Sequence, residues 1–137
     1  MICDLQRLGK AVCFTAEKKK TILVESWGMM RTFMEECLSR ATNCSLEESF
    51  SNTEYVFDYL NSHDSDLLIM ELPAKNEEEI LDLTKEFKTA FPKMKIVHTT
   101  LTCTVKLMEK SKEYGADAIW QKEFSEDSLS GVLKPLI

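Results

Sequence analysis

The sequence predicts an α/β fold, in which a five-stranded parallel sheet is covered by helices on both faces. Short apolar or β-branched segments alternate along the chain with segments whose apolar residues recur at helical spacing. Residues 66–72 form an apolar run of strand length between polar residues, which is typical of a strand buried on both faces. The length of 137 residues suits one domain with a sizeable core.

The first expected strand contains the apolar run of residues 22–24, and Gly28 breaks the chain after it. The expected strands span residues 21–25, 44–50, 66–72, 94–100 and 118–120. Residues 21–137 form the predicted domain, and residues 1–20 form an N-terminal extension to which we assign no structure. The lysines at 18–20 are expected to be a solvated lead-in to the first strand.

Helix boundaries are indicated by capping residues and by residues that stop a helix. Asn76 precedes three glutamates, which favour the positive end of a helix dipole, and Pro92 ends that helix. Gly115 is a natural stop for the next helix, and Ser125 is the expected cap of the last one. The expected helices span residues 29–38, 52–60, 77–91, 105–112 and 126–136. Because a helix follows every strand, right-handed crossovers and a parallel sheet are expected.

Composition argues against several classes of protein. The 17 basic and 23 acidic residues give a net charge of −6, which argues against direct contact with nucleic acid. The cysteine number is odd and no pair has C-x-x-C spacing, which favours a reduced, cytoplasmic protein over a disulfide framework or a zinc site. No apolar run reaches membrane-spanning length, and the N-terminus lacks the apolar core of a signal peptide. The cysteines are Cys3, Cys13, Cys37, Cys44 and Cys103.

Polar residues stand where the expected strands end. Glu25 and Ser26 follow the first strand, Glu71 ends the third, Thr100 ends the fourth and Lys122 follows the fifth. The carboxyl ends of parallel strands meet at one edge of the sheet, so these side chains are expected to lie together. Carboxylates, a hydroxyl and an ammonium suit Mg²⁺-dependent phosphoryl chemistry.

The residues at these strand ends resemble those of the receiver domain of bacterial two-component response regulators. That family has an acidic pair after the first strand, a phosphorylated Asp after the third, Thr or Ser after the fourth and Lys after the fifth. The matching segments are residues 22–26, 67–71, 96–100 and 120–124. The resemblance implies a flavodoxin-like (βα)5 fold, with Glu71 at the phosphoacceptor position and Thr100 and Lys122 as phosphate contacts.

The departures from the family predict a degenerate site. Glu71 replaces the acceptor Asp, and Ser26 replaces one acid of the pair that includes Glu25. A longer acceptor misplaces the reacting oxygen, which in-line chemistry tolerates badly. We therefore expect no catalytic residues, weak or absent Mg²⁺ binding, and a permanent Glu71–Lys122 ion pair. The alternative is an exposed ion pair at the rim, which would contribute little.

Two functions remain open on these grounds. The first is a non-enzymatic receiver-like module that acts through protein partners or a homodimer, without phosphorylation and without membrane contact. It would regulate transcription if an output domain lay beyond Ile137 or on another chain. The second is a still active Mg²⁺-dependent phosphoacceptor or a small phosphoryl-transfer enzyme, and the missing acid at Ser26 disfavours it.

The resemblance implies a binding surface on the fourth helix, the fifth strand and the fifth helix. Trp120 is expected to be its partly exposed anchor, and the alternative is that Trp120 is buried and only stabilises the fold. Trp27 in the first loop is expected to cover the site or to contact a partner. His98 is expected to pack in the core rather than to act with Cys103 as a nucleophile. The candidate surface residues are Lys106, Lys110, Glu113, Trp120, Glu123 and Phe124.

Overall fold

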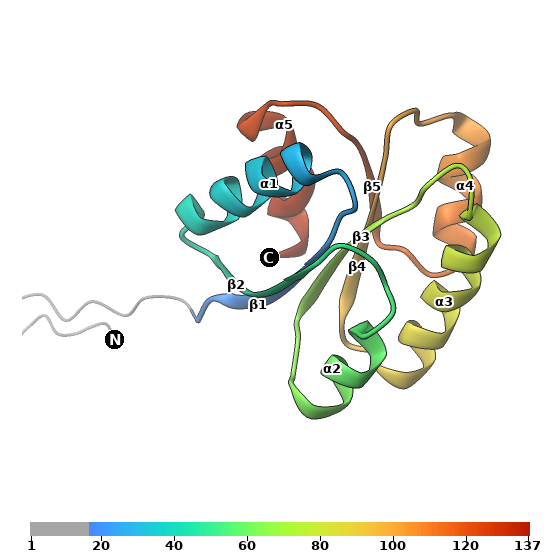
Figure 1. The fold of residues 1–137 in the computed structure, drawn as a ribbon, viewed down its shortest axis with the longest axis horizontal. Coiled ribbons are helices and arrows are strands. Elements are labelled where there is room, and N and C mark those ends of the chain that lie inside the picture. Colours follow the sequence, from blue (N-terminus) through green and yellow to red (C-terminus); the bar gives the residue numbers. More distant parts are fainter. Residues whose placement is uncertain (1–16) are drawn as a thin grey trace, which may run out of the picture.

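A computed structural model describes residues 17–137 and confirms the predicted fold (Figure 1). All five strands are parallel, in the order β2-β1-β3-β4-β5. The strands are β1 (Lys19–Val24), β2 (Cys44–Phe50), β3 (Leu67–Glu71), β4 (Lys95–Thr100) and β5 (Ala118–Gln121). The helices are α1 (Gly28–Arg40), α2 (Val56–Ser62), α3 (Glu77–Ala90), α4 (Val105–Glu113) and α5 (Glu126–Leu133), followed by a 3₁₀ turn (Lys134–Leu136).

The helices form two layers, with α1 and α5 on one face of the sheet and α2, α3 and α4 on the other (Figure 1). Successive residues of β3 point to opposite faces, so Leu68 and Met70 join one core while Leu67 and Ile69 join the other. All four side chains are fully buried, which explains why this strand reads as a continuous apolar run.

The domain begins slightly before the expected boundary at residue 21. The Lys19 backbone N–H donates to the Asn43 carbonyl at 2.9 Å, and the Lys20 N–H donates to the Asp66 carboxylate at 2.8 Å. These lysines therefore belong to β1 although their side chains are exposed. Residues 1–16 of the expected extension, which include Cys3 and Cys13, lie outside the described residues.

Helix ends follow the expected pattern in part. The Ser125 hydroxyl accepts the Ser128 N–H as expected, whereas Asn76 stands at the start of α3 without a side-chain cap hydrogen bond. Gly115 follows α4 with a φ of 114°, a conformation that side chains rarely adopt. Helix α2 starts at Val56, later than expected, because the Asn52 side chain accepts the Glu54 N–H in a preceding turn. Within residues 17–137, none of the helices has the length and apolar character needed to cross a lipid bilayer.

Candidate functional site

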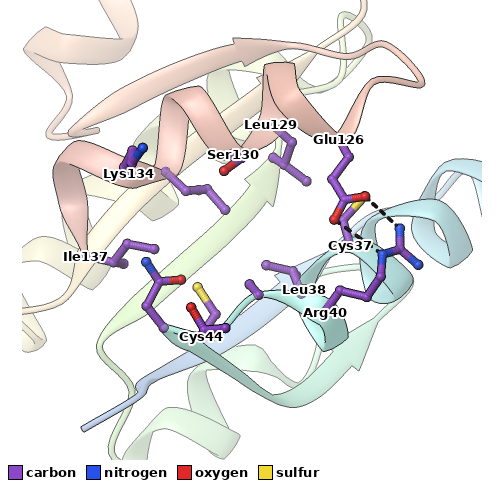
Figure 2. Close-up of a pocket in the computed structure, with 13 residues that line it drawn as sticks. Cys37, Leu38, Arg40, Cys44, Glu126, Leu129, Ser130, Lys134 and Ile137 are labelled. Carbon is purple, nitrogen blue, oxygen red and sulfur yellow. Dashed lines mark hydrogen bonds and ion pairs between the residues drawn. The ribbon is translucent and has the colours of Figure 1, made fainter. Parts of the chain in front are cut away.

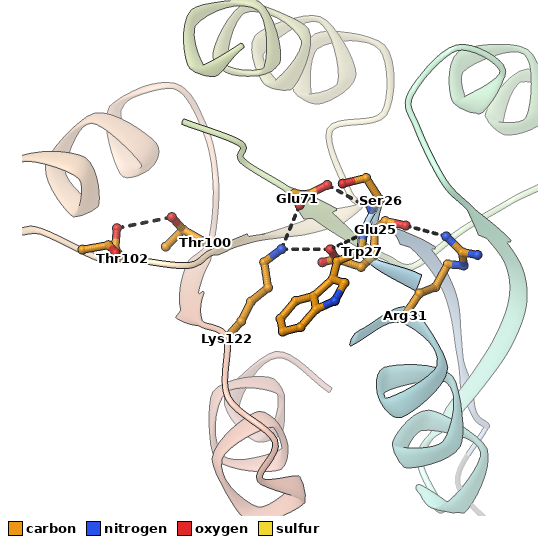
Figure 3. Close-up of polar contacts among 8 residues, drawn as sticks. All are labelled: Glu25, Ser26, Trp27, Arg31, Glu71, Thr100, Thr102 and Lys122. Atoms are coloured by element: carbon orange, nitrogen blue, oxygen red, sulfur yellow. Dashed lines mark hydrogen bonds and ion pairs between the residues drawn. The ribbon is translucent and has the colours of Figure 1, made fainter. Parts of the chain in front are cut away.

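Three charged side chains from distant parts of the chain meet at the carboxyl ends of the strands (Figure 3). Glu25 follows β1, Glu71 is the last residue of β3, and Lys122 follows β5. The Lys122 Nζ donates to Glu25 Oε2 at 2.9 Å and to Glu71 Oε2 at 2.8 Å. We call these three residues the ion cluster. The structure thus places together the three charged residues that the sequence assigned to one site.

The ion cluster is buried, which excludes the alternative of an exposed ion pair at the rim. The side chains of Lys122 and Glu25 are 2% and 0% exposed, and that of Glu71 is 16% exposed. Removing charges from water costs free energy that only close pairing and hydrogen bonds recover. Each charge in the cluster therefore depends on its partners.

Both carboxylate oxygens of Glu71 are engaged. Oε2 accepts from Lys122, and Oε1 accepts the backbone N–H of Ser26 at 3.0 Å. Burial by itself raises the pKa of the Glu71 carboxyl, but the hydrogen bonds from Lys122 and Ser26 outweigh it and hold this pKa below its ordinary value. The backbone N–H of Ser26 thus contributes to the site, and the identity of its side chain did not predict this hydrogen bond.

Glu25 has a different environment from Glu71. Its Oε2 accepts from Lys122 and from the Trp27 backbone N–H at 3.0 Å, while Oε1 has no hydrogen-bond partner among the described residues. Burial raises the pKa of Glu25, and the hydrogen bonds from Lys122 and Trp27 only partly oppose the shift. The Arg31 guanidinium donates to the Glu25 carbonyl at 2.9 Å and so holds the first loop against α1.

The Thr100 hydroxyl does not join the ion cluster by any hydrogen bond recorded for residues 17–137. It donates to the Thr102 carbonyl at 3.3 Å, and Figure 3 shows this pair apart from Lys122. The backbone does connect them, because the Lys122 N–H donates to the Thr100 carbonyl at 2.8 Å. In this structure the Thr100 hydroxyl is therefore bonded within the loop after β4, and its expected role as a phosphate contact stays a prediction.

The donor set does not fit a Mg²⁺ centre. Mg²⁺ requires oxygen ligands in near-octahedral geometry, and Ser26 supplies no carboxylate. The ammonium of Lys122 already donates to one oxygen of each carboxylate, so those oxygens would have to give up these bonds to ligate Mg²⁺. Among residues 17–137, no three His, Cys, Asp or Glu side chains are grouped so that they could hold a metal ion.

The expectation that Trp120 is an exposed anchor is wrong. Trp120 is 2% exposed and packs in the core beneath α1 and α5, and its Nε1–H donates to the Ser128 hydroxyl at 3.0 Å. Residue 120 points toward this layer, whereas the neighbouring Ile119 packs against the opposite core. The alternative, a buried stabilising tryptophan, is the one that the structure supports.

The other candidate surface residues differ in exposure. Lys106, Glu113 and Glu123 are exposed, whereas Lys110 is half-buried because it pairs with Glu77 and Glu78 on α3. Phe124 is 52% exposed, yet it makes edge-to-face contacts with other rings. Its ring centroid lies 5.5 Å from that of Trp27 and 5.3 Å from that of Phe33.

Exposed apolar residues on α4 were missed because helical spacing suggested that they face the core. Val105 and Met108 of α4 are 71% and 48% exposed, and Leu101 in the loop before this helix is 66% exposed. A shallow groove of about 470 Å³ lies beside them, lined in part by Met108, Ser111 and Ile119. The sequence did contain a signal for this exposure, because Val105 and Met108 lie on a different side of the short helix from Leu107, which packs against the core.

A separate cavity of about 340 Å³ lies between α1 and α5 (Figure 2). The thiols of Cys37 and Cys44 line it, and an Arg40–Glu126 ion pair with an N–O distance of 3.0 Å stands at one side. Burial raises the pKa of both thiols, so they are protonated near neutral pH. Both are free cysteines, in agreement with the expected absence of a disulfide framework in the described part.

His98 packs in the core as expected. It is fully buried and is hydrogen-bonded to Thr84 and Ser111 rather than paired with Cys103. Cys103 instead lies in the loop before α4, where its backbone N–H donates to the Gln121 side chain at 2.8 Å.

Comparisons with known proteins relate this fold to receiver domains. No protein-family model matches the sequence, and no curated protein matches it. A response regulator from Thermotoga maritima superposes with a TM-score of 0.77 at 20% identity, covering 88% of this chain and 98% of that chain. The isolated receiver domain of RcsB from Salmonella enterica serovar Typhimurium gives a TM-score of 0.76 at 17% identity, covering 88% of each chain. In a longer RcsB structure from Salmonella typhimurium, the match covers 60% of that chain. At these identities the likeness shows the fold alone, and this chain has the fold of these receiver domains.

Proposed function

We propose that this chain is a phosphorylation-independent signalling module, a receiver-like domain whose site is held in one state by an internal ion cluster. The observation that carries the proposal is the Lys122 ammonium bonded to both Glu25 and Glu71. A receiver changes state when its acceptor carboxylate takes up a phosphoryl group. Here that carboxylate is already occupied by groups of the chain itself.

The chemistry of Glu71 supports this proposal. An acceptor carboxylate needs a free oxygen in line with the phosphorus, and a misplaced nucleophile loses most of its rate. Glu71 accepts from Lys122 on one oxygen and from the Ser26 N–H on the other, so attack would require breaking one of these bonds. Ser26 also stands where a second acid of the pair would help Glu25 to hold Mg²⁺ against the phosphoryl oxygens.

The output of such a module would be a contact surface on α4 and β5, and we propose that it binds a second copy of the chain. Val105 and Met108 expose apolar area there, and Ile119 lines the groove beside them. Exposed lysines and glutamates alternate around this patch, so opposite charges would be available to pair if two copies met across a two-fold axis. The charged residues are Lys106, Glu109, Lys112 and Glu113. The net charge of −6 disfavours nucleic acid as the ligand of this domain.

The phosphorylation half of the proposal is tested by intact-mass measurement after incubation with acetyl phosphate and Mg²⁺. The wild type should gain no phosphoryl group, and a phosphorylatable receiver domain serves as the positive control. Uptake of one phosphoryl group by the wild type, lost in Glu71→Gln, would instead support the active phosphoacceptor.

The surface half is tested by sedimentation velocity over a range of protein concentrations. The wild type should form dimers, and Met108→Glu should stay monomeric because it places a charge in the apolar patch. Met29→Glu is the matched control, since Met29 is 67% exposed on α1, away from this surface. A wild type that is monomeric at every concentration would contradict the dimer.

A further inference from the structure

A polar relay crosses the apolar layer between the sheet and helices α3 and α4. His98 on β4 lies between Thr84 of α3 and Ser111 of α4, and the three residues are 0%, 0% and 1% exposed. His98 Nε2 is 2.8 Å from Thr84 Oγ1, and His98 Nδ1 is 2.6 Å from Ser111 Oγ. The relay thus joins two helices through one strand.

The hydrogen-bond directions in the relay follow from the threonine. The Thr84 hydroxyl donates to the Ile80 carbonyl at 2.7 Å, so its oxygen is left to accept the Nε2–H of His98. The Nδ1 lone pair of His98 then accepts the hydroxyl proton of Ser111. Every polar atom of the three side chains has a partner in this arrangement, and the imidazole is neutral.

The environment of His98 keeps it neutral. Its neighbours in the sheet register are Met70 and Ile119, which supply no charge. Burial lowers the pKa of His98 to about 4. Near neutral pH the imidazole therefore has one donor and one acceptor, as the relay requires.

Helix α4 has little else to fix it to the core. Of its nine residues, all within the described part, Ser111 is the single buried one, and Leu107 is partly buried. Its other links to α3 include the partly exposed ion pairs of Lys110 with Glu77 and Glu78, which solvent weakens, and the Lys85 ammonium over the ring of Tyr114, which caps α4. A buried hydrogen bond from Ser111 is consequently the main directional restraint on this helix.

We infer that the hydrogen bonds of the Thr84–His98–Ser111 relay hold α4 in a fixed position relative to β4 and α3. They thereby keep the proposed contact surface in one arrangement. The inference deepens the proposed function, because α4 carries Val105 and Met108 of that surface. His98 acts here as a positioning residue that sets the place of α4 without touching a partner. The relay restrains α4, whereas the ion cluster restrains the loops after β1 and β5.

Hydrogen exchange followed by mass spectrometry tests whether the relay holds α4 in position. Ser111→Ala and Thr84→Val each remove one bond of the relay with a small change in volume. Exchange of the α4 amides should become about ten-fold faster in Ser111→Ala, because one buried hydrogen bond is lost, while α2 and α5 stay within about two-fold of wild type. Ser39→Ala in α1 and Thr89→Val in α3 are matched controls, because their hydroxyls donate to backbone within their own helices.

A uniform acceleration across all helices, or no change in α4, would overturn the inference. Nitrogen-15 NMR of His98 is the second measurement and needs no variant. The expected result is a neutral imidazole protonated at Nε2, and an imidazole protonated at Nδ1 or at both nitrogens would contradict the relay. The NMR readout of His98 does not depend on dimer formation or on phosphoryl uptake, so the inference and the proposed function can fail separately.

Discussion

Replacing Lys122 by methionine tests whether the ion cluster is a structural centre. Methionine keeps most of the apolar stem of lysine and removes the ammonium. Glu25 and Glu71 would then face one another without the shared cation that now lies 2.9 Å and 2.8 Å from their oxygens. The remaining donors, the backbone N–H groups of Ser26 and Trp27, reach only one oxygen of each carboxylate.

The expected loss follows from the burial of the partners. Breaking a buried ion pair on one side costs about 3–5 kcal/mol, because a charge is left without compensation. The side chains of Lys122 and Glu25 are 2% and 0% exposed, but Glu71 is 16% exposed and regains some water. We therefore expect a loss near the lower end, about 3 kcal/mol of unfolding free energy at pH 7.

Urea unfolding followed by circular dichroism at pH 7 and pH 5 measures this loss. In Lys122→Met both carboxyls have their pKa raised, so the folded state binds more protons and the deficit should shrink as the pH falls. Glu71→Gln in the same background should recover part of the stability by removing one of the repelling charges. The exposed Arg40–Glu126 pair provides the control, and Arg40→Met should change stability little. A Lys122→Met variant as stable as wild type at pH 7 would refute the structural role of the cluster.

Three further predictions concern the core and a turn. The pKa of His98 is about 4 in the fold against an ordinary 6.5, so the unfolded state binds the extra proton between these values. Stability should therefore fall by up to about 3 kcal/mol as the pH drops from 6.5 to 4, and His98→Gln should lack this component when unfolding is measured over the same range. Trp120→Ala should lower the free energy of unfolding in urea by about 3–5 kcal/mol. Trp120→Phe should lower it less, because this variant loses mainly the hydrogen bond to Ser128. Equal stability of Trp120→Ala and wild type would mean that the ring does not stabilise the core. Gly115→Ala should lower the free energy of unfolding by at least about 1 kcal/mol and the thermal midpoint with it, because φ is 114° and the added Cβ would lie 2.9 Å from Lys88 Cγ. An unchanged midpoint would show that the turn relaxes without cost.

The fold was predictable because its signals are local. The apolar run of residues 66–72 is long enough to specify a central strand, and the alternation of strands and helices leaves few topologies. The meeting of Glu25, Glu71 and Lys122 followed from this topology, because parallel strands present their carboxyl ends at one edge.

The direction of individual side chains was not predictable in the same way. Strand β5 has only four residues, and three of them are apolar, so no alternation shows which face Trp120 takes. The hydroxyl of Thr100 is directed by the loop after β4, where the Thr102 carbonyl accepts it. The backbone donors of Ser26 and Trp27 depend on how the chain turns into α1, which side-chain identity does not encode.

The added methylene of Glu71 has two effects that reinforce each other. A glutamate at the end of β3 reaches the Ser26 N–H after β1 with one oxygen and the Lys122 ammonium after β5 with the other. An aspartate at this place is one methylene shorter and could not keep both contacts with the same backbone. The longer side chain that we expect to hinder in-line attack is thus the one that connects the loops after β1 and β5 to the central strand β3. Because those loops are held by the chain itself, the proposed contact surface on α4 and β5 would need no phosphoryl signal to be presented.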